Sequence, residues 1–278
     1  MVAARDLPTA LNLLSNGEGW RPIAGGTDLM VLFNAGKLSF RRLVGIRSIS
    51  ELRAIEESEN ELRIGATATY TQIRRSAILC GAFPLLVTAA SWTGSIANQN
   101  RGTLGGNIAN ASPAADSAPA LLVYDAELEL ASQRGRRRVA MKDFHSGYKR
   151  MEMTPDEMIL SIRLPRQRWT RQYSRKVGAR KAQAIAKVWM AAAANMKDGR
   201  ILDVRIGLGS VAPVPLRCLK TEEALCGQML NPQTLERARA TLRSEIQPID
   251  DIRSTSEYRL QVALNLLDEF LLGRDDLA

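Results

Sequence analysis

The sequence has very little histidine and cysteine, the side chains on which most metal and nucleophilic sites depend. It contains one histidine, His145, and three widely spaced cysteines, Cys80, Cys218 and Cys226. An odd number of cysteines at these spacings gives neither a disulfide framework nor a Cys-x-x-Cys metal site. A single histidine without a nucleophile motif argues against a zinc site and a catalytic triad. We therefore expect no catalytic side chain and no metal ligand, and we expect any chemistry to belong to a bound cofactor.

Long apolar runs are also missing. No window of about 18 consecutive apolar residues occurs, so no transmembrane helix is expected. The N-terminal segment carries Asp6 and Pro8 and lacks the basic-then-apolar order of a signal peptide, which predicts a cytoplasmic protein. The 278 residues are 45% hydrophobic and 24% charged, a balance typical of a globular protein with one large or two modest domains.

Aromatic residues are scarce, at 5%, although the net charge of +9 and the pI near 9.8 suggest a nucleic-acid partner. Few aromatics mean few platforms for base stacking. The basic residues are dispersed, and the one tight run, Arg134 and Arg136 to Arg138, surrounds Gly135 between two strand-like segments. We expect this run to form a solvated hairpin turn. An acidic protein partner explains the charge equally well.

Two glycine pairs lie in distinct segments beside apolar residues. One is in the stretch Asn98–Pro119, which is rich in small polar side chains, and the other is in Ile23–Leu29. Such segments offer little apolar surface, so we expect loops rather than parts of the core. Glycine permits positive φ and close approach of the backbone, and successive N–H groups in such turns form concave nests for phosphate oxygens. The loop Ile23–Leu29 also points at an expected helix N-terminus, which favours anions.

Common nucleotide motifs do not explain these glycine pairs. Gly25 and Gly26 lack the third glycine and the later acidic residue of a dinucleotide fingerprint, and no GxxxxGK[ST] loop occurs. Each loop could hold one side of a pyrophosphate with its N–H groups. The residues alone do not identify the ligand.

The pattern of apolar residues predicts an α/β unit, a second unit with strands and helices, and a C-terminal antiparallel sheet with helices on one side. A linker is expected at 165–170, and a hairpin turn at Asp198 and Gly199. Expected helices cover 7–15, 27–33, 69–78, 83–90, 220–228, 232–245 and 258–272, with Asn231 as one N-cap. Expected strands cover 20–24, 42–46, 61–65, 127–130, 138–141, 156–164, 171–181, 185–196 and 201–208, and 118–124 is either a helix or a strand.

The motifs AGGTDL from Ala24 and TLGGN from Thr103, followed by SPAAD, resemble the FAD-binding (medium) subunit of the xanthine dehydrogenase / carbon monoxide dehydrogenase family of molybdenum hydroxylases. The resemblance covers most of the chain and is specific in order and spacing. It implies an α+β fold, in which a two-subdomain FAD-binding fold of the PCMH type covers residues 1–166, with subdomains of about 1–54 and 55–166. A C-terminal α+β domain, with an antiparallel sheet and helices, is then implied for residues 171–278.

The resemblance also implies where FAD lies, extended between the two N-terminal subdomains. The first loop would wrap the pyrophosphate, and the second would meet it and the flavin side. Asp116 would accept a hydrogen bond from an adenosine ribose hydroxyl, which suits an ionised carboxylate, although a helix N-cap is an alternative. Ile159 would line the adenine or flavin environment, or simply pack in a strand core. Lys176 would approach the cofactor from the C-terminal domain, with a solvated lysine as the alternative and Lys187 as a second candidate. The expected cofactor-binding residues are Ile23, Ala24, Gly25, Gly26, Thr27, Asp28, Leu29, Thr103, Leu104, Gly105, Gly106, Asn107, Asp116, Ile159 and Lys176.

The implied function is electron transfer as an oxidoreductase subunit of a heterotrimer. Electrons would pass from [2Fe–2S] clusters of a small partner subunit to FAD and then to NAD⁺, oxygen or a quinone. A large molybdopterin subunit would oxidise the substrate. FAD is expected to bind noncovalently, because His145 lies outside both loops. The segment from Phe144 to Ile159 is closer to the purine and N-heterocycle branch than to the carbon monoxide branch, and no four-cysteine insertion for an extra iron–sulfur cluster occurs.

Two departures from the family pattern accompany the resemblance. The family commonly opens with an extra aromatic-bearing strand, whereas this chain begins almost at its first helix. ANQNRGT from Ala97 replaces the usual QIxNRGT near the expected flavin ring. Two alternative functions stay open from the residues. A stand-alone flavin oxidase would turn over an organic substrate by itself, and a basic phosphate- or nucleic-acid-binding module would show salt-sensitive binding without flavin.

Overall fold

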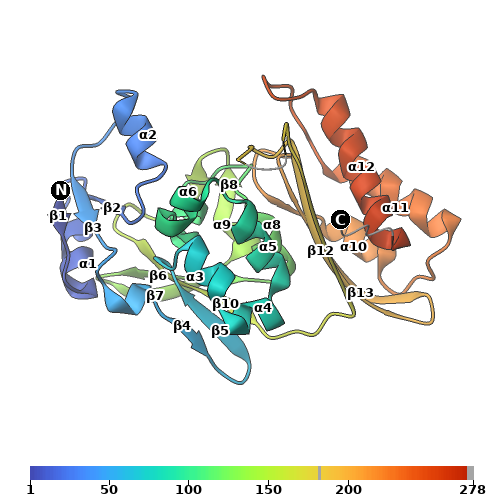
Figure 1. The fold of residues 1–278 in the computed structure, drawn as a ribbon, viewed down its shortest axis with the longest axis horizontal. Coiled ribbons are helices and arrows are strands. Elements are labelled where there is room, and N and C mark those ends of the chain that lie inside the picture. The colour runs from blue at the N-terminus through green and yellow to red at the C-terminus, as the bar shows by residue number, and fades with distance from the viewer. Residues whose placement is uncertain (181–182, 274–278) are drawn as a thin grey trace.

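The computed structural model describes residues 1–180 and 183–273. Its three main sheets follow one another along the chain, and Figure 1 shows them as a small N-terminal unit, a central unit and a C-terminal sheet backed by helices. The chain is thus a mixture of helices and sheets, as the sequence predicts, and most of the strand pairs are antiparallel. No helix among the described residues is both long and apolar enough to span a bilayer.

The N-terminal unit is built on a three-stranded parallel sheet of order β1-β3-β2. Helix α1 begins after Asp6, whose carboxylate accepts a hydrogen bond from the Thr9 N–H, and it buries Leu7, Leu11 and Leu14. Because the strands are parallel, their carboxyl ends meet at one edge, which is where ligands bind in open α/β sheets. The elements are β1 (Val2–Ala3), α1 (Leu7–Ser15), β2 (Arg21–Ile23), α2 (Leu29–Asn34), β3 (Leu43–Gly45) and the 3₁₀ helix η1 (Ser50–Leu52).

A two-residue strand, β1, precedes the first helix. Val2 and Ala3 pair in parallel with Val44 and Gly45 of β3. Two residues carry no periodic pattern, so only the pairing with β3 defines this strand.

The central unit is a five-stranded antiparallel sheet of order β4-β5-β10-β6-β7. One face packs against helices through residues such as Leu62 and Leu128. The other face packs against the N-terminal unit through Met158 and Leu160. The elements are β4 (Ile55–Glu57), β5 (Glu61–Gly65), α3 (Tyr70–Arg75), α4 (Ala77–Ala82), α5 (Pro84–Trp92), α6 (Ile96–Arg101), α7 (Leu104–Ala109), α8 (Ala118–Val123), β6 (Glu127–Ser132), β7 (Gly135–Ala140), α9 (Met141–Phe144), β8 (His145–Gly147), β9 (Arg150–Met151) and β10 (Met158–Pro165).

In the central unit one sequence-based expectation is wrong and another is confirmed only in part. The stretch 98–119 is not one loop, because it contains the end of α6, all of α7 and the start of α8, and it buries Leu104 and Ile108 completely or nearly so in the core. The arginine run does lie at a hairpin, since Gln133 and Arg134 form the turn between the paired strands β6 and β7, but Arg136 to Arg138 lie within β7 and not in the turn. These arginines pair with carboxylates such as Glu157 and Glu127, which leaves no free cationic stripe along β7.

The C-terminal unit is a four-stranded antiparallel sheet of order β11-β12-β13-β14. Helices α10, α11 and α12 cover its outer face (Figure 1), while Trp189 and Ala191 on the other face join the core of the central unit. Asp198 and Gly199, both at positive φ, form the expected hairpin turn. The elements are β11 (Arg171–Val177), β12 (Val188–Lys197), β13 (Arg200–Gly209), β14 (Leu216–Arg217), α10 (Leu219–Leu225), α11 (Pro232–Glu245) and α12 (Ser256–Leu272).

The C-terminal helices show how local chemistry sets element ends. The Asn231 side chain accepts a hydrogen bond from the Thr234 N–H, and Pro232 occupies the first turn of α11, as predicted. Between β10 and β11 the chain runs through 166–170 without a helix or strand. The expected end of a strand at Lys181 lies outside the described residues.

Candidate cofactor-binding site

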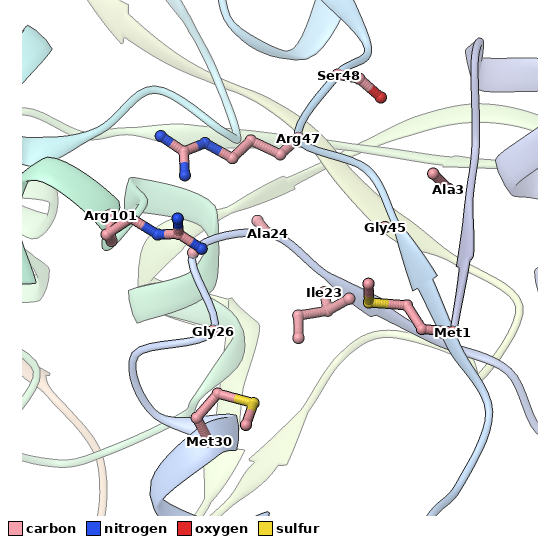
Figure 2. Close-up of a pocket in the computed structure, with 11 residues that line it drawn as sticks. Met1, Ala3, Ile23, Ala24, Gly26, Met30, Gly45, Arg47, Ser48 and Arg101 are labelled. Atoms are coloured by element: carbon pink, nitrogen blue, oxygen red, sulfur yellow. The ribbon is translucent and has the colours of Figure 1, made fainter.

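A cavity of about 400 Å³ opens at the carboxyl edge of the parallel sheet. Ala3, Ile23 and Gly45, which end β1, β2 and β3, all contribute to its wall (Figure 2). The first glycine-pair loop continues directly from β2 along the same wall. The lining residues are Met1, Ala3, Ile23, Ala24, Gly25, Gly26, Met30, Gly45, Arg47, Ser48 and Arg101.

The first glycine-pair loop has backbone donors without acceptors. Some of its carbonyl groups are used, since Ile23 accepts from the Ile46 N–H at 3.0 Å and Gly26 accepts from the Met30 N–H at 2.9 Å. The N–H groups of residues 24–28 find no acceptor in the described part of the chain. Gly26 has φ +74°, a conformation that turns the backbone sharply and suits glycine. The loop therefore presents a row of free N–H groups that suits an anion.

The two glycine-pair loops touch each other. A Cβ placed on Gly25 would overlap the carbonyl oxygen of Arg101 and lie 2.7 Å from its carbonyl carbon. Glycine is thus the residue that allows the end of α6 to pack against the first loop. The Asn110 amide also donates a hydrogen bond to Asp28, at 3.1 Å. The sequence predicted a shared role for the two glycine-pair segments, and the fold brings their neighbourhoods together although the second one begins helix α7.

The second glycine-pair loop differs from the first, because its N–H groups already have acceptors. Leu104 donates to the Ala68 carbonyl at 3.0 Å, and Gly105 donates to the Ala66 carbonyl at 2.8 Å. Gly106 donates to the Thr103 hydroxyl at 3.2 Å, which caps α7. Asn107 donates to the Thr103 carbonyl at 3.0 Å. Of these five residues only Gly106 and Asn107 have accessible surface, and Gly105 instead permits close packing on Ala66.

Asp116 and Lys176 meet where the central and C-terminal units join. The Lys176 Nζ lies 2.7 Å from Asp116 Oδ1, and it donates to the Trp92 carbonyl at 3.2 Å. The Lys176 side chain is only 9% exposed and that of Asp116 only 15%, so Lys176 is not a solvated strand lysine. Burial raises the pKa of Asp116, and Lys176 opposes that rise. Ser117, rather than Asp116, occupies the N-cap of α8, so the capping alternative for Asp116 is wrong.

The remaining candidates have structural surroundings of their own. Ile159 is 5% exposed and belongs to the core between the central sheet and its helices. Lys187 does not join Lys176, because its Nζ lies 5.0 Å from the ring centroid of Tyr258. His145 is buried with Nε2 3.0 Å from the Ile108 carbonyl, and burial lowers its pKa. No cluster of three or more potential metal ligands occurs in the described ranges.

Sequence reasoning missed Arg47, Ser48 and Arg101 as wall residues of the cavity. Arg47 and Ser48 follow the carboxyl end of β3, so the rule that ligands bind at such ends could have indicated them. Arg101 lies two residues before Thr103 of the second glycine-pair loop, yet nothing in the sequence shows that α6 ends against Gly25.

Comparisons with known proteins agree over nearly the whole chain. Residues 1–167 match the FAD binding domain in molybdopterin dehydrogenase, and residues 173–273 match the CO dehydrogenase flavoprotein C-terminal domain. The xanthine dehydrogenase FAD-binding subunit of Escherichia coli O157:H7 is 34% identical over 93% of this chain and 90% of that protein. The glyceraldehyde dehydrogenase medium chain of Sulfolobus acidocaldarius is 31% identical over 94% of this chain and 92% of that protein. A crystal structure of Cu,Mo-CO dehydrogenase in its cyanide-inactivated form contains a chain with a TM-score of 0.91 and 28% identity, covering 98% of this chain and 95% of that one.

Proposed function

Because the chain belongs to the family of FAD-binding subunits of xanthine dehydrogenase- and carbon monoxide dehydrogenase-type molybdenum hydroxylases, we propose that it binds FAD noncovalently and connects iron–sulfur centres with a final electron acceptor. The observation that carries this proposal is the row of free N–H groups in 24–28 at the carboxyl edge of the parallel sheet. A pyrophosphate is a ligand that this row of donors suits.

The residues around the cavity fit a dinucleotide on physical grounds. The free backbone donors of the first loop are accessible to water, and phosphate oxygens would replace that water with charged acceptors. In the second loop, Gly106 and Asn107 offer accessible surface to the same ligand, while Thr103, Leu104 and Gly105 hold that surface in place through their internal hydrogen bonds. We therefore assign direct contact to the first loop and mainly support to the second.

Asp116 and Lys176 would form the edge of the cofactor site where the C-terminal unit meets the central unit. One Asp116 oxygen pairs with Lys176, which fixes the carboxylate in place. The other oxygen has no partner in the described part of the chain, so it is available to accept a hydrogen bond from a ribose hydroxyl. Ile159 would support the site from within the core.

FAD supplies, when bound, the redox chemistry that joins a one-electron iron–sulfur donor to an acceptor such as NAD⁺. The chain's own residues bind and orient the cofactor, and none of them is assigned as a catalytic acid, base or nucleophile. His145 is held against the Ile108 carbonyl rather than on either loop, which supports noncovalent binding.

The proposed partners are a small subunit with [2Fe–2S] clusters and a large molybdopterin subunit that selects the substrate. Helix α2 supports the presence of a partner chain, because its residues Met30, Val31 and Phe33 are 44%, 65% and 53% exposed and the helix buries none of its residues. A run of exposed apolar side chains is typical of a surface that another protein covers. We propose NAD⁺ as the electron acceptor and N-heterocycles as the substrate class of the assembled enzyme.

The proposal is tested with the holoenzyme purified through a tag on this chain. Iron and molybdenum are measured, and NADH is added to the FAD-replete and FAD-free forms while the absorbance of the iron–sulfur centres is followed. We expect reduction of the clusters in the replete form only, with recovery when FAD is returned. Equal reduction of both forms would exclude the connecting role. If NADH reduces neither form, while oxygen reoxidises the chemically reduced enzyme only with FAD present, NAD⁺ is the wrong acceptor.

A further inference from the structure

Two arginines with no partner in the described part of the chain line the cavity beside the first glycine-pair loop. Neither Arg47 nor Arg101 forms a side-chain hydrogen bond or an ion pair there, whereas many other arginines, such as Arg63 and Arg163, pair with carboxylates. Figure 2 shows the Arg101 side chain extending toward Ala24, and the Arg47 side chain extending toward the side of the cavity where Arg101 lies. The two cations thus line the same cavity as Ala24, Gly25 and Gly26 of the first loop.

The backbone around each of these arginines is fixed although its side chain is free. Ile46, before Arg47, donates its N–H to the Ile23 carbonyl at 3.0 Å, and the Ser48 hydroxyl, after it, donates to the Ala4 carbonyl at 3.0 Å. The carbonyl of Arg101 packs on Gly25, and no Cβ could be accommodated between them. Both side chains therefore start from backbone positions that are fixed beside the first loop or beside β1.

The rest of the cavity wall argues for a ligand with both apolar and doubly anionic parts. Met1, Ala3, Ile23 and Met30 give the wall an apolar surface. Two like charges beside unpaired N–H donors repel each other in the empty site, and an anion carrying two charges removes that repulsion. A guanidinium group binds phosphate oxygens through paired N–H donors, which a lysine cannot match in geometry.

We propose that Arg47 and Arg101 each bind one phosphate of the FAD pyrophosphate and so make this chain select a dinucleotide over mononucleotide flavins. The inference rests on the proposed function and adds to it the two side chains that would bind the two phosphates. Riboflavin has no phosphate for these arginines to bind, FMN has one phosphate, and FAD has two.

The test measures binding of FAD, FMN and riboflavin to the full chain freed of cofactor, by titration calorimetry or flavin fluorescence. The variants are Arg47→Gln, Arg101→Gln and the double variant, and the matched control is Arg75→Gln, an exposed arginine on α3 that is absent from the cavity wall. Each single variant is expected to weaken FAD binding by roughly 10- to 100-fold, the scale of one charge-assisted contact. Riboflavin affinity is expected to stay unchanged. FAD affinity should fall with salt less steeply in the double variant than in the original chain, and inorganic pyrophosphate should displace FAD from the original chain.

The outcomes separate this inference from the proposed function. If the original chain binds FAD tightly and both arginine variants behave like Arg75→Gln, the inference is wrong and FAD binding stands. If the original folded chain binds no flavin at all, the proposed function itself is wrong. Equal losses for FAD and riboflavin, together with a lower unfolding temperature in the absence of cofactor, would show a structural role and would also overturn the inference.

Discussion

Gly25 is the residue on which the contact between the two glycine-pair loops depends. Any side chain there would overlap the backbone of Arg101. We predict that Gly25→Ala separates α6 from the first loop, weakens FAD binding by at least about 10-fold and destabilises the chain by about 1–3 kcal/mol, since overpacking has costs of this size. The measurements are the FAD dissociation constant and the free energy of unfolding in urea.

Gly81→Ala is the matched control for that substitution. Gly81 lies in α4, and a Cβ there would have no atom within 4 Å. Because alanine favours helix more than glycine does, this variant should keep FAD binding and gain roughly 0.5–1 kcal/mol. An unchanged affinity in Gly25→Ala would show that the packing of the loops is irrelevant to the site.

At the level of single residues, the sequence could indicate the glycine pairs, but it could not show that one pair has free N–H groups and the other has bonded ones. The free N–H groups of 24–28 and the bonded N–H groups of Leu104 and Gly105 lie in segments of similar sequence, each with a Gly-Gly pair. The difference comes from Ala66 and Ala68, which accept the bonds of the second loop and are distant in the sequence. Asp116 and Lys176 were both predicted, but their mutual ion pair depends on how two units pack. Their roles toward FAD stay predictions.

Strand β7 is tied to the start of β10 by a two-pronged ion pair. The Arg137 guanidinium donates to both Glu157 oxygens, at 2.6 and 2.8 Å, and the Thr154 N–H donates to the same carboxylate. The hydrogen bond from Arg137 lowers the pKa of Glu157 from 4.5 to about 2. A carboxylate whose pKa is lower in the folded state contributes stability above its unfolded pKa. That contribution is lost as the pH falls through the folded pKa.

We therefore predict that stability falls between pH 4.5 and about 2 partly because Glu157 takes up a proton. Glu157→Gln should lower the free energy of unfolding at pH 7 by about 1–2 kcal/mol, a modest figure because Arg137 is partly exposed. The variant should also lose stability less steeply in acid. Urea unfolding at several pH values measures both effects, with the exposed Glu59→Gln as control. Parallel curves for Glu157→Gln and the original chain would contradict the prediction.

At the level of elements, predictions succeed where local chemistry is sufficient. Helices α1 and α11 were predicted with their observed bounds, because a cap, a first-turn proline and an apolar stripe agree. The predicted helix 69–78 is divided in the structure, since the Ser76 side chain accepts from the Leu79 N–H and starts α4. Strands β1, β8 and β9 have two or three residues each, too few for a periodic pattern, and β1 exists only through its pairing with the distant β3.

At the level of the whole molecule, the ion pair between Asp116 and Lys176 joins two units across their interface. Both side chains are largely buried, so removing one partner leaves a buried charge or polar group unpaired. We predict that Asp116→Asn or Lys176→Met alone destabilises the chain by about 3 kcal/mol, and that the double variant loses less than the sum. A double-mutant cycle in urea measures the coupling. Strictly additive losses would show that the pair does not hold the units together.

The order of units was accessible from the sequence, whereas their packing was not. Alternating α/β elements, then an antiparallel sheet with helices, followed from apolar patterns and turns such as Asp198-Gly199. The placement of the cavity at the edge of the parallel sheet required β1, and its wall required Arg47 and Arg101 from separate segments.

The central claim is that this chain by itself binds FAD without a covalent link, and the absorbance spectrum of the purified, folded chain after incubation with FAD and gel filtration tests it most directly. We predict a flavin spectrum, equimolar with protein, and complete release of intact FAD on acid denaturation, with no flavin left on any peptide. A chain that is folded by circular dichroism and yet stays colourless with excess FAD would contradict the account, and flavin retained on a peptide would contradict the noncovalent assignment.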